Sequence, residues 1–183
     1  MTPEDRALDA DFFLTQQPLT LFRLARARYA NLSGLGAASA AGRWNRLGQE
    51  AIYTSTEMGI PVLERLAHTP KDLMPSNLAL MKIKVSGEWQ RGSGNTLVDP
   101  RTGGCMRIYS TLSQADEWHR KKHPELRGVQ GDFAIAVPSI IVPVWNVVLY
   151  PKAMAFWEHV SLESIEAFEF DPRLFPENTP LES

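Results

Sequence analysis

One short segment of the chain, residues 42–68, carries three side chains of complementary chemistry. It places the guanidinium of Arg43 in a Gly-bounded turn, the phenol of Tyr53 in a short apolar run, and the carboxylate of Glu64 in a stretch with helical spacing. Sites that hold a charged ligand and act on it draw their groups from several rigid elements in this way. The segment is therefore a candidate site for an anionic ligand.

Glu64 is the clearest physical indication within this segment. The pattern predicts a helix over about residues 58–68, because Pro61 is tolerated in a first turn. At helical spacing Arg65 points elsewhere, while an apolar, inward face is shared by four residues: Ile60, Leu63, Glu64 and Ala67. A core-facing carboxylate is costly to bury without a partner. Glu64 therefore either faces a ligand cleft or forms a buried structural pair with an arginine.

Two other candidates come before this segment in the chain. Arg23 lies in the alternating run 19–24, where it is either an exposed charge at a strand edge or a side chain aimed into a polar cleft. Residues 26–41 have the Gly and Ser content of a loop, which suits close approach of the backbone to a ligand and includes Ser33.

A further candidate follows a buried strand in the second half of the chain. Residues 133–137 are a continuous apolar run, which is typical of a central strand. Ser139 comes directly after Pro138, so its hydroxyl is either aimed into a cleft or used in a turn. Further strands are expected at four places: 51–54, 78–85, 146–150 and 165–170. A capping box at Ser113–Asp116 predicts a helix.

Composition limits the class of protein. A chain of 183 residues favours one domain, and a formal net charge of −2 gives no electrostatic case for nucleic acid or an acidic membrane surface. The single cysteine, Cys105, excludes a disulfide framework and multi-cysteine zinc motifs, and is expected to be a small buried or loop residue. No secretory signal and no apolar run of roughly 20 residues is present. We therefore expect a soluble, cytoplasmic protein.

The expected organisation has three parts. Residues 1–18 form an N-terminal arm, either a docking segment or an initial helix around an apolar patch. Residues 19–176 form the folded domain, and residues 177–183 are a C-terminal tail.

The motifs named above resemble, in order and spacing, those of the RES domain family, the toxin half of bacterial RES–Xre toxin–antitoxin pairs. The resemblance covers residues 19–175. It is carried by six short stretches: Leu21–Leu24, Leu32–Ala37, Gly42–Asn45, Ile52–Tyr53, Leu63–Glu64 and Val137–Ser139. The chain departs from the family pattern at Tyr150, where an Asn often precedes the proline, and before Asp116, where a glycine is often seen.

The resemblance implies an α+β fold similar to ADP-ribosyltransferases, in which a split central β-sheet with flanking helices holds NAD. Family members attack the bond between nicotinamide and ribose, and no metal is expected. Some degrade NAD with water or phosphate as acceptor, and others transfer ADP-ribose to a protein. The implied partner is an Xre-type antitoxin in an oligomeric complex, without direct contact between the toxin and DNA.

The resemblance also implies roles for individual residues. The catalytic set is Glu64, Arg43, Tyr53 and Ser139, and the NAD-binding set is Arg23, Arg43, Asn45, Tyr53, Ser33 and Ser139. In this scheme Glu64 stabilises positive charge on the ribose, and Arg23 and Arg43 bind the diphosphate. Two alternatives stay open: an ADP-ribosyltransferase that modifies a host protein, and a non-catalytic α+β interaction module in which Arg43 and Glu64 pair in the core.

Overall fold

A computed structural model describes residues 7–70, 73–121 and 132–175. The predicted tail 177–183 and the first six residues of the predicted arm lie outside this range. Strands are found at nine places: β1 (Leu19–Arg26), β2 (Ile52–Ser55), β3 (Leu78–Val85), β4 (Gln90–Arg91), β5 (Thr96–Val98), β6 (Cys105–Ile108), β7 (Asp132–Pro138), β8 (Trp145–Leu149) and β9 (Val160–Phe168). The helical segments are α1 (Phe12–Thr15), η2 (Ala27–Tyr29), α2 (Leu35–Ala38), α3 (Gly59–His68), α4 (Leu112–Lys121), α5 (Phe156–His159) and η5 (Pro172–Leu174).

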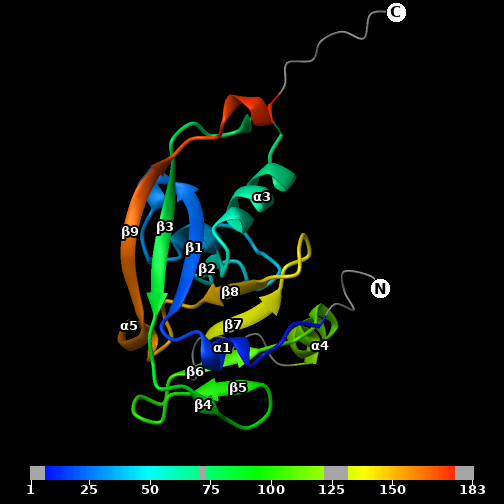
Figure 1. Cartoon of the computed structure of the whole chain (residues 1–183), viewed down its shortest axis with the longest axis vertical. Coiled ribbons are helices and arrows are strands. Elements are labelled where there is room, and N and C mark those ends of the chain that lie inside the picture. The colour runs from blue at the N-terminus through cyan, green and yellow to red at the C-terminus, as the bar shows by residue number, and fades with distance from the viewer. Residues whose placement is uncertain (1–6, 71–72, 122–131, 176–183) are drawn as a thin grey trace, which may run out of the picture.

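The strands form one mixed sheet that is split in the middle. Its order is β4-β5-β6-β7-β8-β2-β1-β3-β9, and β6–β7 is its parallel pair. β1 and β3 pair along their whole length, whereas β1 and β2 share a single register pair, Phe22 with Ser55. In Figure 1 the wing β1-β3-β9 accordingly stands upright while β2, β8 and β7 run across it. The predicted α+β class with a split sheet is confirmed.

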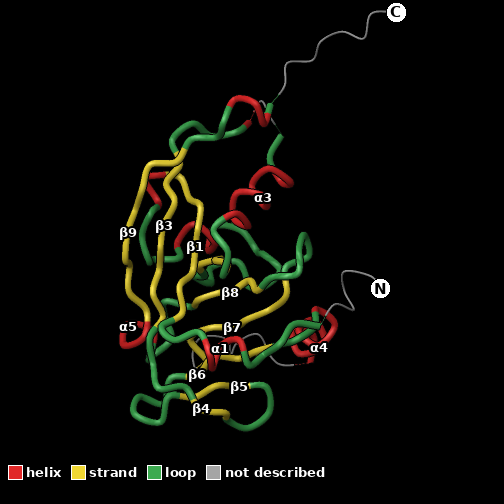
Figure 2. The backbone as a smooth tube through the Cα atoms, viewed as in Figure 1, coloured by secondary structure: helices red, strands yellow, loops and turns green. Residues whose placement is uncertain are grey.

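Short helices surround this sheet, as the red segments in Figure 2 show. α3 follows β2 directly and contacts both β1 and β2, so it covers the split. The predicted bounds of β3 and α3 are confirmed, and Thr69 ends α3 as an extended residue. Side chains on α3, β1 and β2 are therefore brought together at the split.

The core lies under the central strands. In β7, the residues from Phe133 to Pro138 are all buried, as the apolar run predicts. Tyr150, which is 1% exposed, donates a hydrogen bond from its hydroxyl to the carbonyl oxygen of Trp44 at 2.8 Å. This bond ties the turn that carries Arg43 to the core.

Several element boundaries differ from the prediction. β9 begins at Val160, five residues before the predicted start, because the whole strand pairs with β3 whatever its own polarity. The cap of α4 is Thr111, whose hydroxyl accepts from the backbone N–H of Gln114 at 3.2 Å, and not the predicted Ser113. Residues 140–144 form a turn between β7 and β8. In the predicted arm, the described residues 7–18 include the short helix α1.

The arm is anchored by an aromatic contact. Phe13 of α1 is buried, and its ring lies 5.0 Å from that of Trp145, centroid to centroid.

No helix within the described ranges is both long and apolar enough to traverse a lipid bilayer.

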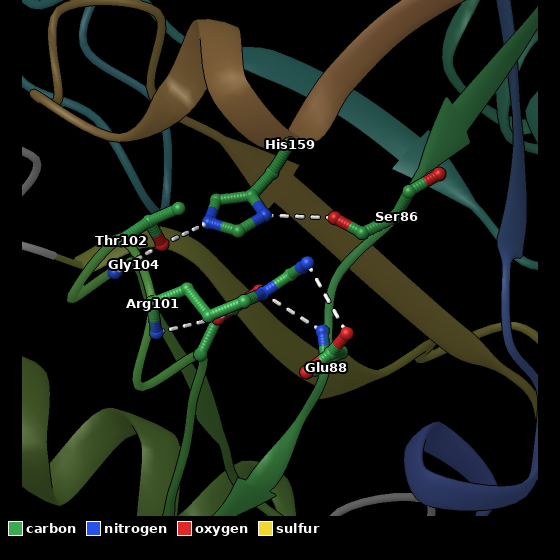
Figure 3. Close-up of polar contacts among 7 residues, drawn as sticks. Ser86, Glu88, Arg101, Thr102, Gly104 and His159 are labelled. Carbon is green, nitrogen blue, oxygen red and sulfur yellow. Dashed lines mark hydrogen bonds and ion pairs between the residues drawn. The ribbon is translucent and has the colours of Figure 1, made fainter.

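A polar network joins the end of β3 to the β5–β6 connection and to α5 (Figure 3). The Nδ1 atom of His159 lies 2.7 Å from the carbonyl oxygen of Ser86, and its Nε2 lies 2.7 Å from the hydroxyl of Thr102. Nδ1 therefore donates to this carbonyl. Beside it, the buried carboxylate of Asp99 accepts hydrogen bonds from the backbone N–H groups of Glu88 and Arg101 and from the Arg101 guanidinium.

Asp99→Asn is expected to lower the melting temperature at neutral pH. The Arg101 side chain, with help from the two backbone donors, holds the pKa of Asp99 well below its usual range. A carboxyl group with a depressed folded-state pKa stabilises the protein above its unfolded pKa, which is about 4, and that contribution is lost as the pH falls. Melting curves recorded between about pH 3 and pH 7 should show a smaller acid-induced loss of stability for the variant than for the parent.

Asp171→Asn is the matched control. The pKa of the Asp171 carboxyl is also lowered, chiefly by the Arg173 side chain, but the Asp171–Arg173 pair is exposed and screened by water. The melting temperature of the Asp171→Asn variant should stay close to that of the parent. If Asp99→Asn behaved in the same way, the network in Figure 3 would not contribute to stability as argued.

Candidate active site

Three adjoining cavities in the described part of the chain share Tyr53 at the split of the sheet. The α3 cavity, about 220 Å³, is lined by Glu64, Arg65 and His68 of α3 together with Leu24 and Thr54. The Arg23 cavity, about 350 Å³, is lined by Arg23, Arg65 and the loop from Gly36 to Gly42. The Arg43 cavity, about 330 Å³, is lined by Arg43, Glu64, His68, Asn146 and the turn after β7. Together they form one cleft beside α3.

Glu64 lines both the α3 cavity and the Arg43 cavity, as do Tyr53 and His68. It is half-buried, and its Oε1 accepts a hydrogen bond from Nδ2 of Asn146 in β8 at 2.7 Å. This bond crosses from the helix to the sheet and fixes the carboxylate at the cavity wall. Of the two interpretations of the sequence, the arrangement agrees with a carboxylate facing a cleft.

The face of α3 that turns inward differs from the prediction. Ile60 is buried, but Leu63 is 43% exposed and Ala67 is exposed. Arg65, predicted to point elsewhere, lines two cavities. The helix is rotated toward the side that carries Pro61, so that beside the buried Ile60 its cavity-lining residues are Pro61, Glu64, Arg65 and His68.

Arg43 lines the same cavity as Glu64 but has a different partner. Its Nη2 and Nε atoms donate to the two carboxylate oxygens of Asp116 in α4 at 2.6 Å and 3.2 Å. The guanidinium carbon also lies 5.3 Å from the centre of the Trp44 ring. Arg43 is therefore held in place by a bidentate ion pair, and the core pair with Glu64 that a non-catalytic module would require is not formed.

Asn45 and Tyr53 form a second fixed unit in the cleft. The Tyr53 hydroxyl donates to Oδ1 of Asn45 at 2.7 Å and accepts from the backbone N–H of Trp44 at 3.1 Å. Asn45 is only 4% exposed, and its Nδ2 donates to three carbonyl oxygens: those of Ala37, Ala40 and Arg46. This unit holds the phenol ring of Tyr53, a residue that is 37% exposed, at the junction of the three cavities.

Arg23 and Arg65 face the Arg23 cavity together. Arg23 is half-buried in β1, and its Nη1 donates to the carbonyl oxygen of Asn31 at 3.0 Å. Burial, followed by the nearby charge of Arg65, lowers the pKa of Arg23. Arg23 is therefore aimed into a polar cleft and is not an exposed edge charge.

The two predicted serines are engaged in local turns. The hydroxyl of Ser33 lies 2.6 Å from Oδ1 of Asn31 and donates to it. Ser139 is 1% exposed, and its hydroxyl accepts from the backbone N–H of Ile141 at 3.2 Å. Ser139 thus supports the turn whose neighbours, Pro138 and Ile140, line the Arg43 cavity. Contacts of either serine with NAD stay a prediction.

Three residues that line the cleft were missing from the sequence-based set, namely Arg65, His68 and Asn146, and so was Asp116, which holds Arg43. Asn146 faces the Arg43 cavity, and its Oδ1 atom is buried with no hydrogen-bond partner in the described structure. Its role follows from the pairing of β8 between β2 and β7, which a single sequence does not reveal. Arg65 was recognisable in principle, because it stands four residues after the inward-facing Pro61.

Neither metal binding nor thiol chemistry gains support from the described residues. Among them, no group of three or more His, Cys, Asp or Glu side chains is arranged to hold a metal ion. Burial and the neighbouring Asp132 raise the pKa of Cys105 to about 12, so its thiol stays protonated at neutral pH.

Gly42→Ala tests the packing around the Asn45–Tyr53 unit. A Cβ atom at position 42 would lie 2.5 Å from Oδ1 of Asn45 and 2.6 Å from the Tyr53 hydroxyl, so one side chain must move. We expect a loss of stability of about 1–3 kcal/mol. Gly36→Ala is the control for thermal unfolding, because nothing lies within 4 Å of a Cβ there. Equal melting temperatures for the two variants would contradict the packing described.

Comparison with known proteins agrees with this architecture. A family model described as the RES domain matches residues 20–171. Toxin Res of Photorhabdus laumondii is 28% identical over 159 residues, which cover 85% of this chain and 97% of that protein. The Prs ADP-ribosylating toxin of Sphingobium sp. is 26% identical over 149 residues, which cover 79% of this chain and 86% of that protein.

Among solved structures, a chain in the crystal structure of the M. tuberculosis MbcT–MbcA toxin–antitoxin complex is similar, with a TM-score of 0.54 and 19% identity. The match covers 87% of each chain. At this identity the likeness is one of fold, and it agrees with the ADP-ribosyltransferase-like α+β arrangement predicted from the sequence.

Proposed function

The chain belongs to the RES domain family, and from this premise we propose that it is the toxin of a bacterial toxin–antitoxin pair that cleaves the nicotinamide–ribose bond of NAD. One observation carries the proposal: Glu64, Tyr53 and Arg43 line a single cavity at the split of the sheet. NAD is the substrate in this scheme, and the name of the similar Prs ADP-ribosylating toxin supports it.

In the proposed reaction the C1′–N1 bond breaks and its electron pair leaves with nicotinamide. The ribose then carries positive charge in an oxocarbenium-like transition state. The half-buried Glu64 carboxylate, oriented by Asn146, stabilises that charge electrostatically. The exposed face of Tyr53 stacks on the nicotinamide ring or bounds the ribose, because its hydroxyl is already committed to Asn45.

Arg43 has a narrower role here than the sequence suggested. The Nε and Nη2 edge of its guanidinium is occupied by Asp116, so we assign Arg43 to the wall of the nicotinamide end of the cleft. Ser139 acts in the same region by supporting the turn that carries Ile140 and Ile141.

Two acceptors are compatible with the cleft. Attack of water on C1′ of this ribose gives ADP-ribose and a proton. Attack of phosphate on the same carbon gives the phosphate ester of ADP-ribose at that carbon. A nucleophilic side chain of a host protein is a third candidate acceptor, and the similarity to the Prs ADP-ribosylating toxin favours including it. A cognate antitoxin is the proposed partner, since the similar solved chain comes from a toxin–antitoxin complex. That it is of the Xre type rests on the resemblance in sequence.

The test is a product analysis with purified protein. NAD labelled in the adenosine part is incubated with the protein in phosphate-free buffer, in phosphate buffer, and with a cell extract. Release of nicotinamide together with free ADP-ribose indicates hydrolysis. Release of nicotinamide together with the phosphate ester of ADP-ribose indicates phosphorolysis, and label on a protein band indicates transfer to a protein. Intact NAD under all three conditions would overturn the proposal.

A further inference from the structure

We infer that Arg65 and Arg23 together form the binding site for the diphosphate of the dinucleotide, and that Arg43 lies outside it. The inference rests on the proposed function for the identity of the ligand. It assigns a binding role to Arg65, and it places the adenosine end of the ligand in the Arg23 cavity.

The shape of the Arg23 cavity suits an anion. Two guanidinium groups, from β1 and α3, face a space of about 350 Å³. Its lining also includes five small residues of the loop before Arg43: Gly36, Ala37, Ala40, Ala41 and Gly42. Small side chains let a phosphate approach the backbone closely, and Arg forks match the geometry of phosphate oxygens.

The charge balance of this cavity points the same way. None of the residues that line it is acidic, and in the part of the chain that the structure describes Arg65 has no acidic partner. Two cations that face one cavity repel each other, and the lowered pKa of Arg23 reflects first its burial and then the nearby charge of Arg65. A bound diphosphate would relieve the repulsion, whereas the free protein bears its cost.

Arg43 contrasts with this pair. Its Nε and Nη2 atoms are bonded to Asp116, so a phosphate that used this edge of the guanidinium would have to displace that carboxylate. Tyr53 lines both the Arg23 cavity and the Arg43 cavity. A ligand whose diphosphate lies between Arg23 and Arg65 therefore brings its neighbouring ribose past Tyr53 toward Glu64, which is the order of groups in NAD.

The experiment measures binding of ADP-ribose and of adenosine by calorimetry, together with NAD kinetics. Arg65→Gln should weaken ADP-ribose binding roughly tenfold to a hundredfold, as expected for a lost hydrogen bond to a charged group. Adenosine, which has no phosphate, should bind the parent and the variant equally. The KM for NAD should rise more than kcat falls, because the contact is made before and during the reaction.

Stability separates a binding role from a structural one. Removing one of two like charges should leave the melting temperature unchanged or raised. Arg65→Lys, which keeps the charge without the fork, should restore part of the affinity. Arg46→Gln is the control, an exposed arginine outside the three cavities, and should match the parent.

The outcomes distinguish this inference from the proposed function. Binding of ADP-ribose that depends on Arg65, without any NAD turnover, would support the inference and remove the proposed reaction. NAD turnover with unchanged ADP-ribose affinity in Arg65→Gln would overturn the inference and leave the reaction standing. A parent protein that does not bind ADP-ribose would overturn the inference as well.

Discussion

Glu64→Gln is expected to reduce the rate of NAD cleavage roughly a hundredfold to a thousandfold, the range seen when a group that stabilises transition-state charge is removed. Glutamine has the shape of glutamate, and its amide oxygen can still accept the hydrogen bond from Asn146. The fold and the cavity should therefore persist. What is lost is the negative charge facing the ribose, and the loss should appear in kcat more than in KM.

Three measurements make this prediction specific. Thermal unfolding should be within about 1 kcal/mol of the parent, because no buried donor is left unpaired. ADP-ribose binding should be retained, since the diphosphate lies at the other end of the cleft. Glu57→Gln, at an exposed acidic residue just before α3, should turn over NAD at the parental rate. Parental turnover by Glu64→Gln would exclude its carboxylate from the reaction.

The sequence was sufficient for the elements that depend on local pattern. The alternation of residues 78–85 gave β3, the apolar run at 133–137 gave the buried centre of β7, and Pro61 with Thr69 bounded α3. These signals are local because burial on one face imposes a period on the residues themselves. The inward position of Glu64 follows from the same pattern, although the rotation of the helix does not.

The remainder of the site depends on contacts between distant parts of the chain. The partner of Arg43 is Asp116, which is 73 residues away in sequence, and that of Glu64 is Asn146, which is 82 residues away. No spacing rule links such positions, so an Arg43–Glu64 pair was as plausible from the sequence as the pairs observed. β9 shows the same limit in the fold, because an exposed edge strand carries little pattern of its own.

Asn45 is where the structure most changes the expectation, and Asn45→Asp is the second prediction with a large effect. From the sequence Asn45 was a ligand contact. In the structure its amide is 4% exposed, donates to three carbonyl oxygens and accepts from Tyr53, so its hydrogen-bonding capacity is spent inside the protein. It fixes the loop that walls the Arg23 cavity and the turn that carries Arg43.

Aspartate has almost the same shape but no donor, so its carboxylate would face three carbonyl oxygens with no hydrogen to share. Leaving buried polar groups unpaired around a charge is among the costliest single changes. We expect a loss of about 3 kcal/mol or more in the free energy of unfolding, or roughly 6–12 °C in melting temperature for a chain of this size. NAD cleavage should fall as well, because the loop and the turn that the Asn45 amide holds beside Tyr53 would shift.

Asn77→Asp supplies the matched control, the same isosteric change at an exposed asparagine, and should shift the melting temperature little. The comparison decides between the two roles of Asn45. If Asn45→Asp melted with the parent and lost only affinity for NAD, its amide would contact the ligand directly, as the sequence suggested. If it melted well below the parent, Asn45 organises the cleft from beneath, and the surface that NAD meets is made by Tyr53, Glu64 and the paired Arg23 and Arg65.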